Sequence, residues 1–329
     1  MIINLTDTGT AAVQQAMSKA RRNVGGASGL VFTLVVVTEL SEYDRALAAC
    51  LEAGREHPSR ILLVTNGRAR TDRLDATVRA GEDAPGEIVS LKFHGALQQH
   101  RDSVVLPLLL PDLPVIVWWP GRSPMAPGQD PVGRLGTRRI TDAMGDPDPL
   151  SALEVRARNY CDGDTDLTWT RLTRWRGLLA AALDAYPMDV TRASVSAAPE
   201  NAAGTLLAAW LSDRLDIPVT LDRQQPGIGI TGVSLSSGDD TITVVRTDGN
   251  LAKFSAPGLP QRLVALPRRD LNTLLAEELR RLSDDPVYAE AMSALVRRLD
   301  RAAERTQGRT LWLVDQDSAV ELPYFDCAM

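Results

Sequence analysis

The chain has 329 residues, a formal net charge of −6 at pH 7, 44% hydrophobic residues and 24% charged residues. This length exceeds one ordinary hydrophobic core and favours two domains, and the composition is that of a globular protein in water. The acidic charge argues against a nucleic-acid partner, because phosphate binding needs a basic face. Residues 1–7 lack a basic region followed by an apolar core, so we expect no signal peptide and a cytoplasmic location.

The first half of the sequence is typical of a parallel sheet covered by helices. A helix is expected over 11–22, followed by a strand at 30–37, a helix over 42–55 and a strand at 61–65. A strand, a helix and a strand in succession form a right-handed crossover unit with parallel strands. Strands near 87–93 and 138–142 extend the sheet, and a helix begins at Asp148-Pro149. We predict an α/β N-terminal domain, residues 1–186, with a doubly wound, mostly parallel sheet.

The nearly uncharged run from Ser103 to Gly121 is interrupted by prolines, which exclude a continuous helix and a membrane span. Residues 115–118 prefer strand structure, so the run predicts a central parallel strand that ends at Trp118 and Trp119. Ligands and partners dock beyond the carboxyl ends of such strands. Neighbouring strand residues point to opposite faces. We therefore expect Trp118 to be structural and treat Trp119 as a candidate partner contact, with core packing as the alternative.

Residues 166–183 are expected to form one helix rich in tryptophan and arginine. At 100° per residue, Arg176 falls within the apolar face, where its guanidinium needs a carboxylate or a bound anion. Asp142 and Asp166 are the candidate acids, and both are expected to be structural. The two remaining arginines project away from this face, where a partner, an anion and solvent are equal alternatives. The helix contributes Trp169, Trp175 and Arg176 as structural residues and Arg171 and Arg174 as candidate contacts.

The second half predicts an α+β C-terminal domain, residues 187–329, with a largely antiparallel sheet. Strands are expected at 190–196, 219–222, 228–236, 241–247, 251–255 and 262–266, with a helix over 200–214. Two helices follow, one opened by Asp270 and one beginning near Val287, and their apolar stripes can cover one face of this sheet. A closing pair of strands is expected at 310–314 and 318–322.

Catalytic motifs are scarce. Gly227–Gly232 matches the dinucleotide-binding fingerprint, but an alternating strand follows it where that motif requires a helix, so we reject this interpretation. The best acid–base candidate is His57, which precedes Ser59 and Arg60 at the entry of a buried strand. A tight connection between helix and strand is the alternative for this segment. Cys50, Cys161 and Cys327 lie far apart and predict no disulfide or zinc framework, which leaves the redox activity of Cys327 open.

Four segments together resemble the glucose-6-phosphate dehydrogenase assembly protein family, OpcA. They are His57–Arg60, the run ending at Trp118-Trp119, Arg138–Asp142 and Asp166–Arg176. The resemblance covers the whole chain. It implies a cytoplasmic, non-catalytic protein without a cofactor, which binds glucose-6-phosphate dehydrogenase and promotes its assembly and activity in the oxidative pentose phosphate pathway.

An alternative function is a sugar-phosphate enzyme, such as an isomerase or a lactonase, that uses His57 and Arg60 in an α/β crevice. Under either reading, one set of side chains is expected to contact a partner protein or an anion such as a sugar phosphate. This set is His57, Ser59, Arg60, Trp119, Arg171 and Arg174.

Overall fold

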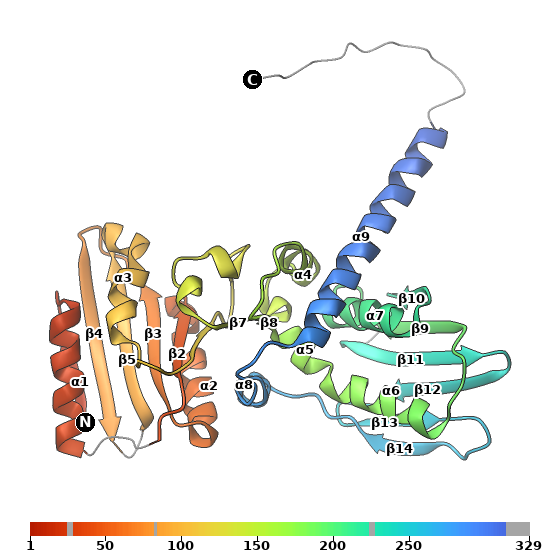
Figure 1. Cartoon of the computed structure of the whole chain (residues 1–329), viewed down its shortest axis with the longest axis horizontal. Helices are drawn as coiled ribbons and strands as arrows, with labels where there is room; N and C mark the ends of the chain where they lie inside the picture. Colours follow the sequence, from red (N-terminus) through yellow and green to blue (C-terminus); the bar gives the residue numbers. More distant parts are fainter. Residues whose placement is uncertain (25–28, 82–83, 224–227, 314–329) are drawn as a thin grey trace, which may run out of the picture.

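A computed structural model describes residues 1–24, 29–81, 84–223 and 228–313 of the chain. Figure 1 shows two lobes, each built around one sheet. The strands of the first sheet are β1 (Ile2–Leu5), β2 (Thr33–Thr38), β3 (Ser59–Asn66), β4 (Arg73–Gly81), β5 (Ala84–His94), β6 (Val115–Trp118), β7 (Arg138–Thr141) and β8 (Asp164–Asp166). The helices of this part of the chain are α1 (Thr10–Val24), α2 (Tyr43–Glu56), α3 (Arg101–Val105) and α4 (Pro149–Arg158).

The first sheet is mostly parallel, as predicted. Its order among the described residues is β1-β4-β5-β3-β2-β6-β7-β8, and every pairing from β5 to β8 is parallel. Taken without β1 and β4, this is the 3-2-1-4-5-6 order of doubly wound dinucleotide-binding folds. The sequence analysis missed β1 and β4, which add an antiparallel edge, and it missed the short β8.

Both faces of the first sheet are covered. Val35, Leu62 and Val89 face α1 and α3 in one buried cluster, while the neighbouring residues of the same strands face α2 in another. Trp118 belongs to the α2 cluster and Trp119 to the opposite one. The alternation expected for two adjacent strand residues is therefore present, because a doubly wound sheet buries both sides.

The second sheet is mixed, with mostly antiparallel pairings. Its strands are β9 (Arg192–Ala197), β10 (Val219–Asp222), β11 (Ile230–Ser237), β12 (Asp240–Arg246), β13 (Leu251–Ser255) and β14 (Arg262–Ala265). The helices after β8 are α5 (Leu167–Arg171), α6 (Thr173–Ala185), α7 (Ala202–Leu215), α8 (Leu271–Leu279) and α9 (Pro286–Leu313). In the described ranges the order is β10-β9-β11-β12-β13-β14, and only the β9–β10 pairing is parallel.

The core of the second lobe includes side chains from before residue 187. Leu153 of α4, Trp169 of α5 and Trp175 and Leu179 of α6 pack in the same cluster as α7 and the second sheet. The burial of Trp169 and Trp175 agrees with their expected structural roles. The division of the chain between residues 186 and 187 stays a prediction, while these contacts attach α4, α5 and α6 to the second core.

The helix α8 joins the two lobes. Leu274, Leu275 and Leu279 pack beside α2 in the cluster that covers the first sheet. The expectation that α8 covers the second sheet is therefore wrong. The reason is a complementary surface: α2 presents small residues such as Ala46 and Cys50 to the leucines, which allows the two helices to approach closely.

Two further expectations are wrong. The helix expected over 166–183 is divided, because α5 ends at Arg171 and α6 begins at Thr173. The helix α9 continues through Leu313, so there is no strand beginning at residue 310. Residues 297–313 include many good helix formers and no proline, which favours continuation of the helix. The predicted strand at 318–322 and Cys327 lie outside the described residues.

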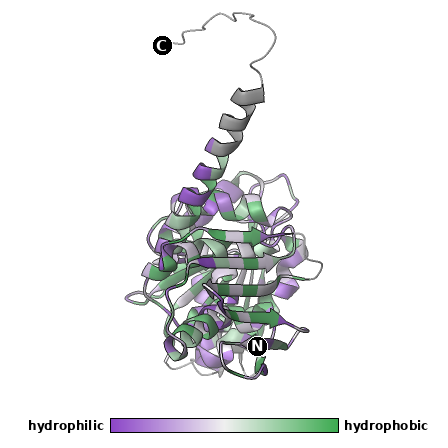
Figure 2. Cartoon of the chain, turned by 90° about the vertical axis from the view of Figure 1, so that its right-hand side faces the viewer, coloured by the Kyte–Doolittle hydropathy of each residue, from purple (hydrophilic) through white to green (hydrophobic). Residues whose placement is uncertain are grey.

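The amino-terminal turns of α9 pack on the second core through Tyr288, Met292 and Leu295, whereas residues 301–304 are exposed. The helix then leaves the body of the molecule, as two views show (Figure 1, Figure 2). Every helix within the described ranges is too short or too polar to cross a membrane.

Replacement of Leu275 tests the packing of α8. Leu275 is 0% exposed, so Leu275→Ala is expected to lower the free energy of unfolding by about 2–5 kcal/mol. The matched control is Leu263→Ala, because Leu263 is 61% exposed and its truncation should change stability by less than ~0.5 kcal/mol. Urea denaturation measures both. Equal midpoints for the two variants would contradict the packing described here.

Candidate functional site

The carboxyl edge of the first sheet contains a crevice at the point where the strand order reverses, between β2 and β6. A cavity of about 260 Å³ lies there, lined by residues that include Thr38 and Glu39 after β2, Asn66 at the end of β3 and Trp119 and Arg122 after β6. In open α/β sheets this is the ordinary position of a bound ligand.

The turn after β2 does not suit a dinucleotide. Dinucleotide-binding folds place a glycine-rich turn here, so that backbone N–H groups approach the pyrophosphate. The turn in this chain reads Thr38-Glu-Leu-Ser-Glu42, without glycine, and both glutamates line the crevice. Their carboxylates disfavour a pyrophosphate, although Glu42 is paired with Arg45 at 3.0 Å and Arg101 and Arg122 also line the crevice. The fingerprint-like segment rejected from the sequence leads into strand β11, as expected.

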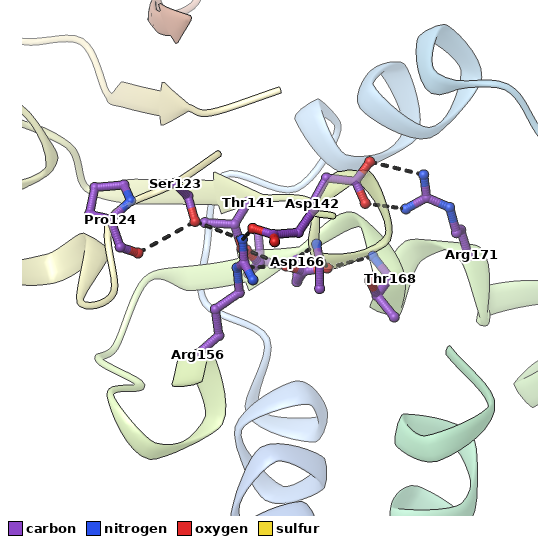
Figure 3. A network of polar contacts seen from close by, with 11 residues as sticks. Ser123, Pro124, Thr141, Asp142, Arg156, Asp166, Thr168 and Arg171 are labelled. Carbon is purple, nitrogen blue, oxygen red and sulfur yellow. Dashed lines mark hydrogen bonds and ion pairs between the residues drawn. The ribbon is translucent and has the colours of Figure 1, made fainter. Parts of the chain in front are cut away.

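A buried polar network lies at the ends of β7 and β8 (Figure 3). Its centre is Asp166, which is 0% exposed. The Asp166 carboxylate accepts hydrogen bonds from the Thr141 hydroxyl at 2.6 Å, from the Ala143 N–H at 3.0 Å and from the Thr168 N–H at 2.8 Å. The Nε of Arg156 on α4 lies 3.4 Å from the same carboxylate. The network therefore joins two strands to α4 and caps α5.

Asp142 is the second buried acid of this network. Two hydrogen bonds from the Arg171 guanidinium, of 2.6 and 2.9 Å, hold its carboxylate in a bidentate arrangement. Burial raises the pKa of the Asp142 carboxyl, and the Arg171 charge opposes this effect. The structural roles expected for Asp142 and Asp166 agree with this burial and bonding. Arg171, predicted as a candidate contact, is engaged by Asp142 and keeps part of its side chain exposed.

Arg176 does not pair with Asp142 or Asp166, so that expectation is wrong. Its guanidinium lies over the Trp169 ring, 3.5 Å from the ring centroid, in a cation–π contact. Burial lowers the pKa of Arg176 to about 10, while Asp285 acts in the opposite direction. The helical projection failed because the break at Leu172 changes the phase between α5 and α6. The partner of Asp166 is instead Arg156, which the sequence analysis did not single out.

The segment 57–60 lies at the amino end of β3, on the edge opposite the crevice. Arg60 is 5% exposed, and its guanidinium pairs with Glu87 at 2.7 Å and donates to the Leu108 carbonyl. Ser59 is also buried, and the Nε2 of His57 is buried without a hydrogen-bond partner among the described residues. This arrangement favours the connecting role for the segment, since the Arg60 guanidinium is already paired with Glu87.

The remaining candidate contacts differ in exposure. Trp119 lines the crevice but is 2% exposed, which favours packing against the sheet. Arg174 is exposed on α6. The structure therefore does not gather the six candidate contacts into one site: His57, Ser59 and Arg60 lie at one sheet edge, Trp119 at the other, and Arg171 and Arg174 beside the second lobe.

A second cavity, of about 430 Å³, was not anticipated from the sequence. It lies where α5, α6 and α7 meet the ends of β12 and β14, and Arg171 is the only predicted contact among its described lining residues. Its other arginines are Arg246, Arg268 and Arg269. In the sequence these residues lie in ordinary strand ends and turns, so no local pattern identifies them as neighbours. Across the described ranges, no group of three or more His, Cys, Asp and Glu side chains is placed to hold a metal ion.

Two family models match the chain in succession. The glucose-6-phosphate dehydrogenase subunit N-terminal domain matches residues 51–158, and the corresponding C-terminal domain matches residues 162–292. The chain belongs to the OpcA family of glucose-6-phosphate dehydrogenase assembly proteins. The resemblance carried by the four sequence segments is thereby confirmed. No curated protein is significantly similar to this OpcA family member.

Solved structures with a similar arrangement are oxidoreductases of low sequence identity. An oxidoreductase domain protein from Kribbella flavida has a TM-score of 0.45 and 11% identity, covering 85% of this chain and 98% of its own. A 3-ketoreductase from Actinomadura kijaniata has a TM-score of 0.43 and 11% identity, covering 82% and 96%. A dehydrogenase from Clostridium difficile has a TM-score of 0.42 and 7% identity, covering 83% and 99%. Structural similarity this low does not indicate an activity for the present chain.

Replacement of Asp166 tests the buried network. Asp166→Asn leaves the Arg156 charge without its buried partner and is expected to cost about 3–5 kcal/mol of unfolding free energy. The control is Asp300→Asn, which removes an exposed partner of Arg158 and should cost less than ~1 kcal/mol. Thermal and urea unfolding of the two variants provide the measurement. A variant at position 166 as stable as the control would show that the network contributes little.

Proposed function

We propose that the chain binds glucose-6-phosphate dehydrogenase and promotes formation of its active oligomer, without catalysing a reaction itself. The observation that carries this proposal is the match of both subunit domains, in order, over residues 51–292. A protein that binds one assembly state of an enzyme more tightly shifts the population toward that state in proportion to the difference in affinity. Activation by this route needs a binding surface and no catalytic groups.

Three groups among the described residues favour a non-catalytic role for the crevice and the segment 57–60. Glu39 and Glu42 occupy the turn where a dinucleotide would place its pyrophosphate. Arg60, proposed for a sugar-phosphate enzyme, is buried and paired with Glu87, which also pairs with Arg21. His94 is buried and bonded to Asp75 at 3.1 Å, on the edge formed by β4 and β5. None of these groups is arranged for proton transfer to a substrate.

Arg174 is the predicted contact that fits a protein partner best. It is exposed and no hydrogen bond or ion pair engages it within the described part of the chain, whereas Arg171 is held by Asp142. Arginine is enriched among the residues that dominate interface energetics. We propose that Arg174 contributes to the surface that binds the dehydrogenase.

The test is a titration of the cognate glucose-6-phosphate dehydrogenase with this protein. Dehydrogenase activity and complex mass are expected to rise together and to saturate. Arg174→Ala should weaken the complex by about tenfold, equivalent to ~1.4 kcal/mol, with an unchanged unfolding midpoint. Arg55→Ala is the matched control, because Arg55 is a similarly exposed helical arginine on the first lobe.

Two outcomes would contradict the proposal. One is a titration in which neither the activity nor the mass of the dehydrogenase changes. The other is turnover of sugar phosphates by this protein alone, which would favour the isomerase or lactonase alternative. Equal affinities of the Arg174→Ala and Arg55→Ala variants would exclude Arg174 from the contact surface while leaving the partner assignment intact.

A further inference from the structure

The cavity of about 430 Å³ is built from separate segments of the chain that converge on one space. It is lined by Leu172 between α5 and α6, Trp175 on α6, Ala203 in the first turn of α7, Arg246 at the end of β12 and Arg268 after β14. Its volume lies within the range of about 300–1,000 Å³ typical of small-molecule sites. Most of the lining is apolar, and the polar groups are few and mostly cationic.

Four arginines line this cavity in the described part of the chain, and two of them lack an acidic partner. Arg171 is bonded to Asp142, and Arg269 to Glu277. Arg246 instead donates to the Gly249 and Leu266 carbonyls, and Arg268 to the Ile228 carbonyl. These last two guanidinium groups form no ion pair with a carboxylate among the described residues, so their positive charges are uncompensated by a direct partner.

Arg246 has the features of a ligand-binding cation. Its guanidinium carbon lies 5.4 Å from the centroid of the Trp175 ring, and its Nε is buried without a hydrogen-bond acceptor. Burial lowers the pKa of Arg246, the nearby Arg268 charge lowers it further, and the Asp248 charge acts in the opposite direction. A half-buried cation beside a second cation, with an unused donor, is stabilised when an anion enters.

The start of α7 adds positive charge of another kind. Asn201 caps this helix by accepting the Gly204 N–H at 2.8 Å, and Asn201 and Ala203 both line the cavity. The N–H groups of the first helical turn have no partner within a helix, and the helix dipole places partial positive charge at this end. Because Asn201 already caps this helix end and its first residues are buried, the helix contributes its partial positive charge to the cavity and the two arginines remain the principal attraction for an anion.

Negative charge near the cavity is limited and peripheral. Glu200 lines it and is exposed. Asp248, also exposed, accepts the Asn250 and Leu251 N–H groups, and its charge acts on both Arg246 and Arg268 without a direct ion pair. The guanidinium donors of Arg246 and Arg268, which have no carboxylate bonded to them, suit a phosphate group, which has three terminal acceptor oxygens and a charge between about −1.5 and −2. The accessible apolar side chains of Met144, Pro149 and Ile228, which also line the cavity, suit an attached carbon skeleton.

We propose that this cavity binds a small organic phosphate ester. Arg246 and Arg268 hold the phosphate group, and the accessible apolar side chains of Met144, Pro149 and Ile228 contact the organic part. The site is distinct from the crevice at the first sheet and from the exposed Arg174 surface, and the proposal does not depend on the identity of the partner protein.

Isothermal titration calorimetry on the full chain tests the proposal with four probes: glucose 6-phosphate, glycerol 3-phosphate, inorganic phosphate and glucose. At least one ester is expected to bind saturably at one site, at least about tenfold more tightly than inorganic phosphate, whereas glucose should not bind. Arg246→Gln and Arg268→Gln should each weaken the ester by about tenfold or more. Arg192→Gln is the matched control, because Arg192 is an exposed arginine that also donates to a backbone carbonyl.

Different results of the titrations test binding itself, the role of the organic part and the location of the site. Absence of saturable binding of both esters up to about 10 mM would overturn it. Equal affinities for the esters and inorganic phosphate would remove the role of the organic part. Loss of binding in Arg192→Gln as well would indicate a general charge effect instead of this site. Because Arg268 is exposed, its variant is expected to stay folded, which circular dichroism verifies independently of binding.

Discussion

The structure depends on a carboxylate that has no contact with water. Asp166 is buried at the end of β8, where a charge is tolerated only if hydrogen bonds and an opposite charge surround it. The partners are the Thr141 hydroxyl on β7, the Ala143 N–H just after β7, the Thr168 N–H in the first turn of α5 and Arg156 on α4. The requirement fixes where α5 begins, and α5 in turn places Arg171 on Asp142 and at the wall of the larger cavity.

The two lobes are joined by hydrophobic packing and an ion pair as well as by the connecting chain. The helix α8 comes from the second half of the chain but completes the hydrophobic cluster over α2. Buried Arg138 of β7 pairs with Glu278 of α8, and the Thr170 hydroxyl donates to the same glutamate at 2.7 Å. Trp169 and α4 pack into the opposite core. The core of each lobe thus contains side chains from the other half of the sequence. These shared contacts couple the stabilities of the two lobes and oppose rotation of one lobe relative to the other.

The sequence predicted those parts of the fold that short-range patterns determine. The apolar runs of β2, β3 and β6 identified parallel strands, and alternation with tight turns identified the second sheet. Contacts between distant residues were not predictable in the same way. The leucine stripe of α8 was recognised, but not its packing against α2, more than 200 residues away in sequence. Arg176 was misplaced by a single break at Leu172, and the cavity arginines come together only through tertiary structure.

The acidic turn after β2 has a consequence for coenzyme binding as well as for the fold. A chain with the strand order of a coenzyme-binding domain would ordinarily withdraw dinucleotide from solution whenever it is abundant. Glu39 and Glu42 oppose this by placing negative charge where the pyrophosphate would lie. The strand order of a coenzyme-binding domain is thus kept in this chain together with a turn that disfavours the coenzyme itself.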